Sequence, residues 1–161
     1  MKCKLTPELS SGDWKDFCSR FHFASTDLPH IQAIYTALLP LVECYAYYSL
    51  DQDLDEVSLS HYAYGFVTLG TGLDELSELY LNHEQIQEAY IVDCISLVLL
   101  SKAYEAFAHV VENQTNLHLA ELSFLGDTYS LDLLPQIYEH LAPDAIRLTE
   151  GLMLRPLKTA T

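Results

Sequence analysis

The chain has 161 residues, half of them hydrophobic, and its 8 Lys and Arg against 23 Asp and Glu give a formal net charge of −15. This length is typical of one domain around one core, so we expect residues 1–161 to form a single domain. The acidic balance argues against nucleic acids and anionic membrane surfaces as partners, because both would be repelled. It favours partners with basic surfaces.

No stretch is apolar for long enough to cross a bilayer, and the first residues lack the apolar core of a secretory signal. We therefore expect a cytoplasmic protein. The four cysteines are scattered without a C-x-x-C pair, which argues against a zinc site. Cys44 and Cys94 lie in apolar stretches and are interpreted as small buried residues.

Two helices are predicted in the N-terminal third. Residues 10–13 contain two serines and an aspartate, which is typical of a helix start, and apolar residues follow at helical spacing to Phe21. Residues 27–29, Asp-Leu-Pro, predict a second start with Asp27 as the N-cap. Apolar residues at helical spacing extend that helix to Leu39.

Strands and a long helix follow. Residues 43–50 and 62–69 are rich in aromatic and β-branched side chains and predict two strands. Between them, residues 51–56 form an acidic turn; a hard-cation site is the less favoured interpretation, since the glycine and terminal glutamate of an EF-hand loop are missing. Residues 84–111 predict a helix whose middle is apolar nearly all round and therefore buried on most faces.

The C-terminal part predicts a strand over 117–124, a short helix over 131–141 and a strand pair over 146–154. Because helices and strands interleave along the chain, we expect an α+β fold with mixed layers.

The sequence Gly70-Thr71-Gly72 separates a predicted strand from a helix, a place where backbone N–H groups can face an anion. A dinucleotide fingerprint needs a further glycine at position 75, which is Glu. Asp74 and Glu75 suit the helix dipole and repel phosphate. We therefore interpret the turn as a helix start, with phosphate binding as the less favoured alternative.

Two stretches resemble the activation (reactivation) domain of cobalamin-dependent methionine synthase and its small stand-alone relatives. Residues 66–74, FVTLGTGLD, are similar to the strand and turn in which those relatives carry TLGPGLD. Residues 148–156, LTEGLMLRP, are similar to the family's LTES segment, which precedes a Met-containing strand and a proline. An apolar helix and a Gly-Asp turn lie between them in family order, so the resemblance covers residues 62–156.

The resemblance implies helices packed on a mostly antiparallel sheet. It also implies a function: in the full enzyme this domain binds S-adenosylmethionine and presents its methyl group to oxidised cobalamin, while a flavodoxin-type partner supplies the electron. The chain has no D-x-H-x-x-G cobalamin signature and no cysteine cluster, so it cannot be a complete methionine synthase. It would meet cobalamin only through a partner, a corrinoid protein or a methyltransferase subunit.

The resemblance assigns ligand contacts to five residues. They are Glu105, Gly126, Asp127, Tyr129 and Glu150. The two glutamates would contact the ligand's amine or ribose; the alternative is that both are solvated acids. The family's ligand loop, R-x-x-P-G-Y-G-D, corresponds to residues 122–129, where the arginine and the Pro-Gly-Tyr turn are missing. Loss of a charge-assisted bidentate partner costs about 1.5–3 kcal/mol.

Two functions therefore stay open. The first is an S-adenosylmethionine-binding reactivation partner of a corrinoid-dependent methyltransferase, in which Arg147 or Arg155 replaces the missing arginine. The second is a non-catalytic binding or regulatory module that has kept the fold and lost the ligand site. An unrelated enzyme has no supporting set of residues. His118, beside the most loop-like segment, is the histidine of most interest, although an isolated histidine is more typical of a surface.

Overall fold

Helices and antiparallel strands build the part of the chain that the structure describes. This computed structural model describes residues 1–50, 63–116, 118–119 and 121–161. The elements are β1 (Lys2–Lys4), α1 (Ser11–Phe21), α2 (Leu28–Leu38), β2 (Tyr45–Ser49), β3 (Tyr64–Thr68), α3 (Gly72–Asn82), α4 (Ile86–Thr115), α5 (Leu134–Leu141), β4 (Arg147–Leu148), β5 (Leu154–Arg155) and β6 (Thr159–Ala160). Short 3₁₀ turns at Ser25–Asp27, Leu39–Leu41 and Leu131–Leu133 adjoin α2 and α5.

The main sheet has the order β1-β2-β3-β6, and each neighbouring pair is antiparallel. Its centre is the pairing of β2 with β3, in which Tyr47 lies opposite Phe66. Strands β4 and β5 form a separate antiparallel hairpin. The expected α+β class with a mostly antiparallel sheet is confirmed.

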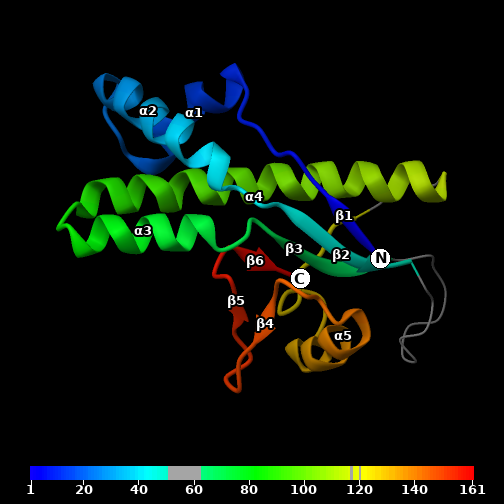
Figure 1. Cartoon of the computed structure of the whole chain (residues 1–161). Helices are drawn as coiled ribbons and strands as arrows, with labels where there is room; N and C mark the ends of the chain where they lie inside the picture. Colours follow the sequence, from blue (N-terminus) through cyan, green and yellow to red (C-terminus); the bar gives the residue numbers. More distant parts are fainter. Residues whose placement is uncertain (51–62, 117, 120) are drawn as a thin grey trace.

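Both faces of the sheet are covered (Figure 1). Neighbouring side chains of a strand point to opposite faces. Ala46 and Tyr48 therefore join a core with the helices α1 to α4, whereas Tyr47 and Phe66 join a second core with α5 and the segment around Ile146. Because neither face is left to water, the central strands are apolar without the alternation of a half-exposed strand.

The predicted helix starts are present, with one difference in detail. At α1, the Ser10 Oγ accepts a hydrogen bond from the Asp13 N–H at 3.3 Å, and the Asp13 carboxylate accepts one from the Ser10 N–H at 2.7 Å. This reciprocal pair is a capping box. Asp27 precedes α2 as predicted, but its carboxylate accepts from the Ala24 N–H and caps the short 3₁₀ turn instead.

The predicted strand over 117–124 is wrong for the residues described there, 118–119 and 121–124, which form a loop. No strand of the described residues pairs with this stretch: β3 lies between β2 and β6 in the sheet. The loop reaches the C-terminal segment only at its end, where the Leu125 N–H donates to the Thr161 carbonyl at 3.2 Å. The predicted acidic turn and cation alternative at 51–56 lie outside the described residues.

Candidate functional site

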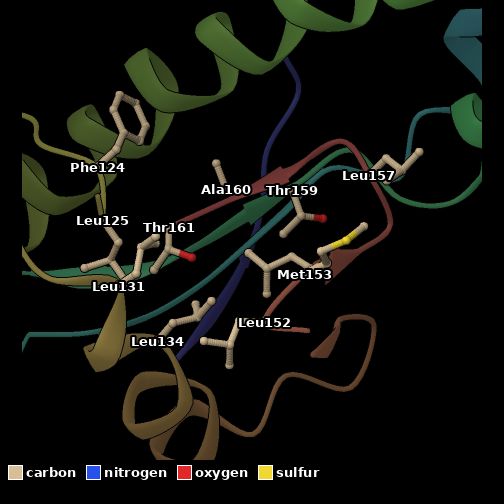
Figure 2. A pocket seen from close by; sticks show the side chains of 11 residues that line it. Phe124, Leu125, Leu131, Leu134, Leu152, Met153, Leu157, Thr159, Ala160 and Thr161 are labelled. Atoms are coloured by element: carbon tan, nitrogen blue, oxygen red, sulfur yellow. The ribbon is translucent and has the colours of Figure 1, made fainter. Parts of the chain in front are cut away.

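A hollow of about 440 Å³ opens on the α5 side of the sheet. We call it the apolar hollow. It is lined by Phe124, Leu125, Leu131, Leu134, Leu152, Met153, Leu154, Leu157, Thr159, Ala160 and Thr161. Figure 2 shows that these side chains come from three segments: the loop after α4, the start of α5, and the C-terminal strands. The hollow is a shallow, open depression whose lining is mainly apolar.

The loop wall of the apolar hollow is a tight turn. The Gly126 N–H donates to the Tyr129 carbonyl at 2.7 Å, and the Asp127 N–H donates to the Phe124 carbonyl at 3.1 Å. Gly126 has a φ of 95°, which a glycine adopts without strain. The Phe124 ring packs on Tyr104 of α4 with centroids 5.0 Å apart, which fixes the loop to the long helix.

The hairpin wall is held by Thr149. Its carbonyl accepts from the Leu152 N–H at 2.9 Å, and its hydroxyl accepts from the Met153 N–H at 3.1 Å. Leu152 has a φ of 56°, a left-handed conformation that is unfavourable for a leucine. Leu152 is one of five non-glycine residues with a positive φ among the described residues, and it is the one of the five that lines the hollow.

The C-terminal wall is fastened to α3 and α4. The Asp74 carboxylate accepts from the Leu157 N–H at 2.6 Å, and the Lys158 ammonium donates to Asp93 at 2.9 Å. One oxygen of this wall, Thr161 Oγ1, is buried with no hydrogen-bond partner among the described residues. A buried polar atom without a partner is costly unless a water or ligand satisfies it.

The structure brings some of the five predicted contact residues together and separates others. Gly126, Asp127 and Tyr129 form the turn directly behind the lining residues Phe124 and Leu125, and all three are exposed. Glu150 is exposed at the tip of the hairpin, two positions before the lining residue Leu152. Four of the five predicted residues are thus close in sequence to lining residues of the apolar hollow without lining it themselves.

Glu105 lies elsewhere. Its carboxylate is 3.2 Å from the Lys102 ammonium, which also lies 3.2 Å from Asp13 of α1. This face of α4 is turned to the N-terminal helices, so Glu105 does not join the other four residues. These surroundings fit the interpretation of Glu105 as a solvated acid on the helix surface.

Arg147 and Arg155 do not line the apolar hollow. They are directly opposite in the β4–β5 register, as are Leu148 and Leu154. Because strand side chains alternate, the two leucines and the two arginines point to opposite faces of the hairpin. The arginines line a second hollow of about 410 Å³, the charged hollow. Its residues are Thr71, Asp74, Glu75, Glu78, Asp144, Ala145, Arg147, Arg155 and Pro156.

The glycines at the start of α3 are explained by packing. A Cβ on Gly70, whose φ is 82°, would lie 2.9 Å from Glu43 Cβ. A Cβ on Gly72 would lie 2.5 Å from the Leu41 carbonyl oxygen. Both positions allow the backbone before β2 to approach closely. This supports the interpretation of the turn as a helix start.

The isolated titratable groups have ordinary structural surroundings. His118 is fully exposed, 3.7 Å from Glu112, whose pKa is lowered mainly because its carboxylate accepts a hydrogen bond from the Leu119 N–H.

Cys44 and Cys94 are buried as predicted, and burial raises the pKa of Cys44 to about 12. Within the described ranges, no group of three or more His, Cys, Asp or Glu side chains gathers as a metal site.

Most of the residues that line the apolar hollow carry no recognisable signal in the sequence. Leu131, Leu152 and Leu157 are about half exposed, and only their meeting in space makes them a site. The signal that pointed to the region was the family loop at 122–129.

No family model matches the chain, and no curated protein matches it closely enough to count as a relative. No helix within the described residues is long and apolar enough to cross a membrane.

Proposed function

We propose that the protein binds S-adenosylmethionine in the apolar hollow and acts as a reactivation-type partner of a cobalamin-dependent methyltransferase. The observation that carries the proposal is the position of the hollow. Its lining includes Phe124 and Leu125, which belong to residues 122–129, the segment that corresponds to the ligand loop of the resembled family. Cobalamin would belong to the partner, a corrinoid protein or methyltransferase subunit, and the cytoplasm would be the place of action.

The contact between the two family-like segments supports the proposal. Asp74, the last residue of the first segment, accepts a hydrogen bond from Leu157, which directly follows the second. The segments are 83 residues apart in the sequence at this contact. The two segments meet in the lining of the charged hollow, through Asp74 and Pro156, whereas only the second segment, through residues 152–154, also lines the apolar hollow.

The chemistry of the hollow suits part of this ligand. Its leucines, Phe124 and Met153 offer an apolar wall for the adenine ring, and the orphaned Thr161 hydroxyl offers a polar atom at the edge. Asp127 and Glu150 border the hollow and would attract the ligand's sulfonium and ammonium charges. The protein's contribution is to hold the methyl group in place for a partner, which is catalysis by positioning.

A second function is favoured by one specific observation. The two arginines that were candidates to pair with the ligand's carboxylate face the other side of the hairpin. A module that keeps the fold without binding S-adenosylmethionine would bind the corrinoid or methyltransferase subunit directly. A stable complex with that subunit, formed without the ligand, would distinguish this module.

Calorimetry tests the first function. We expect saturable heat with S-adenosylmethionine at up to millimolar concentration, and a rise in Tm because the ligand binds only the folded state. Leu131→Trp should abolish the heat by filling the hollow. Leu122→Trp is the matched control, since Leu122 is 46% exposed, close to the 53% of Leu131, and does not line the hollow. No heat and no rise in Tm with the unaltered protein would refute ligand binding.

A further inference from the structure

The charged hollow carries opposite charges on its two walls, and it is separate from the apolar hollow. Arg147 and Arg155 come from the β4–β5 hairpin, whereas Glu75 and Glu78 come from the first two turns of α3. Glu75 and Glu78 are three positions apart and therefore lie on the same side of the helix.

The pair of arginines in the charged hollow is electrostatically unfavourable when no ligand is bound. Arg147 and Arg155 are directly opposite in the hairpin register, and like charges in that position repel each other. Lys2, Lys102 and Lys158 are each within 3.2 Å of an acid. No carboxylate of the described residues lies within 4.0 Å of either guanidinium, and the same holds for Lys4, Lys15 and Arg20. In a chain with 23 acids and 8 basic side chains, this arrangement leaves two planar bidentate donors available to an oxyanion.

The acidic residues of the charged hollow restrict which kind of ligand can carry that oxyanion. Asp144 is already held by Lys2 and Tyr47. One oxygen of Asp74 accepts from the Leu157 N–H, while the other, Oδ1, is buried without a hydrogen-bond partner among the described residues. Glu75 and Glu78, the other two acids of this lining, are exposed. They repel a free phosphate or dicarboxylate and attract a cation. A ligand that satisfies both walls has no net charge and carries a carboxylate and an ammonium group.

We infer that the charged hollow binds a small zwitterion of the free α-amino acid class. The carboxylate is held by Arg147 and Arg155, and the ammonium lies towards Glu75 and Glu78. This second site is on the opposite face of the hairpin from the apolar hollow, and it does not depend on S-adenosylmethionine binding.

NMR titration of the ¹⁵N-labelled full chain tests the site, with L-alanine as the probe and acetate, methylammonium and inorganic phosphate as partial mimics. We expect L-alanine to shift the amide signals of Thr71, Glu75 and Arg155 in a saturable way, while each mimic binds at least about tenfold more weakly. Arg155→Gln and Arg147→Gln should each weaken L-alanine binding about tenfold to a hundredfold. Arg20→Gln, an exposed arginine on α1, should leave it unchanged.

Three results would overturn the inference. Acetate or phosphate binding as well as L-alanine would make the site a simple anion site. Shifts confined to residues 124–129 and 152–154 would place the amino acid in the apolar hollow, and the absence of shifts would mean that no zwitterion binds. Because the arginines are exposed on a two-residue strand pair, the variants should retain the amide spectrum of the folded chain elsewhere.

Discussion

Lys2, Tyr47 and Asp144 form a polar cluster that joins β1 and β2 to the loop before β4. The Lys2 ammonium donates to both Asp144 oxygens at 2.9 and 3.0 Å, and the Tyr47 hydroxyl donates to the same carboxylate. These hydrogen bonds, from Tyr47 first and Lys2 second, hold the pKa of Asp144 below its usual range. Hydrogen bonds to Asp144 and Tyr47 raise the pKa of Lys2. The cluster therefore predicts how the free energy of unfolding depends on pH.

Asp144→Asn should lower the free energy of unfolding at pH 7, and the deficit should shrink in acid. A carboxyl whose pKa is lower in the folded than in the unfolded chain stabilises the fold above the unfolded pKa of about 3.9. That stabilisation is lost as the pH falls through the folded pKa. Urea unfolding at pH 7 and pH 3 measures the difference. Asp16→Asn, an exposed acid of α1, is the control; an Asp144→Asn deficit of equal size at both pH values would contradict the assignment.

Gly72 and Gly12 differ in the space available to an added Cβ, so we predict opposite effects of their alanine variants on stability. Gly72→Ala should destabilise the protein by about 1–3 kcal/mol, because its Cβ would overlap the Leu41 backbone and force a shift. Gly12→Ala, in the first turn of α1, meets Ser10 Oγ at an ordinary 3.5 Å and should stabilise by about 0.5–1 kcal/mol. Thermal unfolding of both variants checks the opposite signs. A neutral Gly72→Ala would show that the turn is not closely packed.

At the scale of single residues, the sequence predicted local chemistry better than it predicted contacts. The capping pair of Ser10 and Asp13 was readable because both partners lie within one helical turn. Glu105 could not be placed, since its partner Lys102 also pairs with Asp13, which is 89 positions before Lys102, and the side of α4 that faces α1 depends on the tertiary fold. Arg147 and Arg155 were candidates for the ligand's carboxylate, but the face they occupy depends on the hairpin register.

Among the elements, α4 shows how burial follows from packing on several sides. The middle of α4 contacts α2, α3 and the sheet, so Leu99 is fully buried, whereas Leu97 two positions earlier is 51% exposed. Leu99→Ala should therefore lower the free energy of unfolding by about 2–5 kcal/mol. Leu97→Ala, the same substitution within one turn, should change it by no more than about 0.5 kcal/mol. Urea unfolding measures both, and equal losses would contradict the helix orientation.

Helices and strands were predicted correctly where the element is long or carries a local signal such as a helix cap. Helices α1 to α5 and strands β2 and β3 have caps or long apolar patterns that predict them. Strand β6, with two residues, has too short a pattern to recognise. The predicted strand over 117–124 has suitable side chains, but no strand of the described residues pairs with residues 118–119 or 121–124. Strand pairing over long sequence distances is not contained in a local pattern.

At the scale of the whole molecule, the sheet separates two regions. The helices α1 to α4 cover one face with the larger core, while α5 and the β4–β5 hairpin lie on the other face (Figure 1). Helix α5 and this hairpin both contribute residues to the lining of the apolar hollow. The sequence predicted the layered class, and the resemblance pointed to the loop beside the hollow. It could not predict the hollow itself, since the lining residues come from three segments that meet only in the folded chain.

The apolar hollow contains a natural probe, because the chain has two methionines and one of them lines it. Met153 is 50% exposed in the hollow, and Met1 is 59% exposed at β1, where its amine donates to the Tyr48 carbonyl. The protein labelled with ¹³C at the methionine methyl groups should therefore give two signals. On titration with unlabelled S-adenosylmethionine, we expect the Met153 signal to shift saturably and the Met1 signal to stay in place. A Met153 signal that does not move at millimolar ligand, or that moves together with Met1, would contradict binding in the apolar hollow.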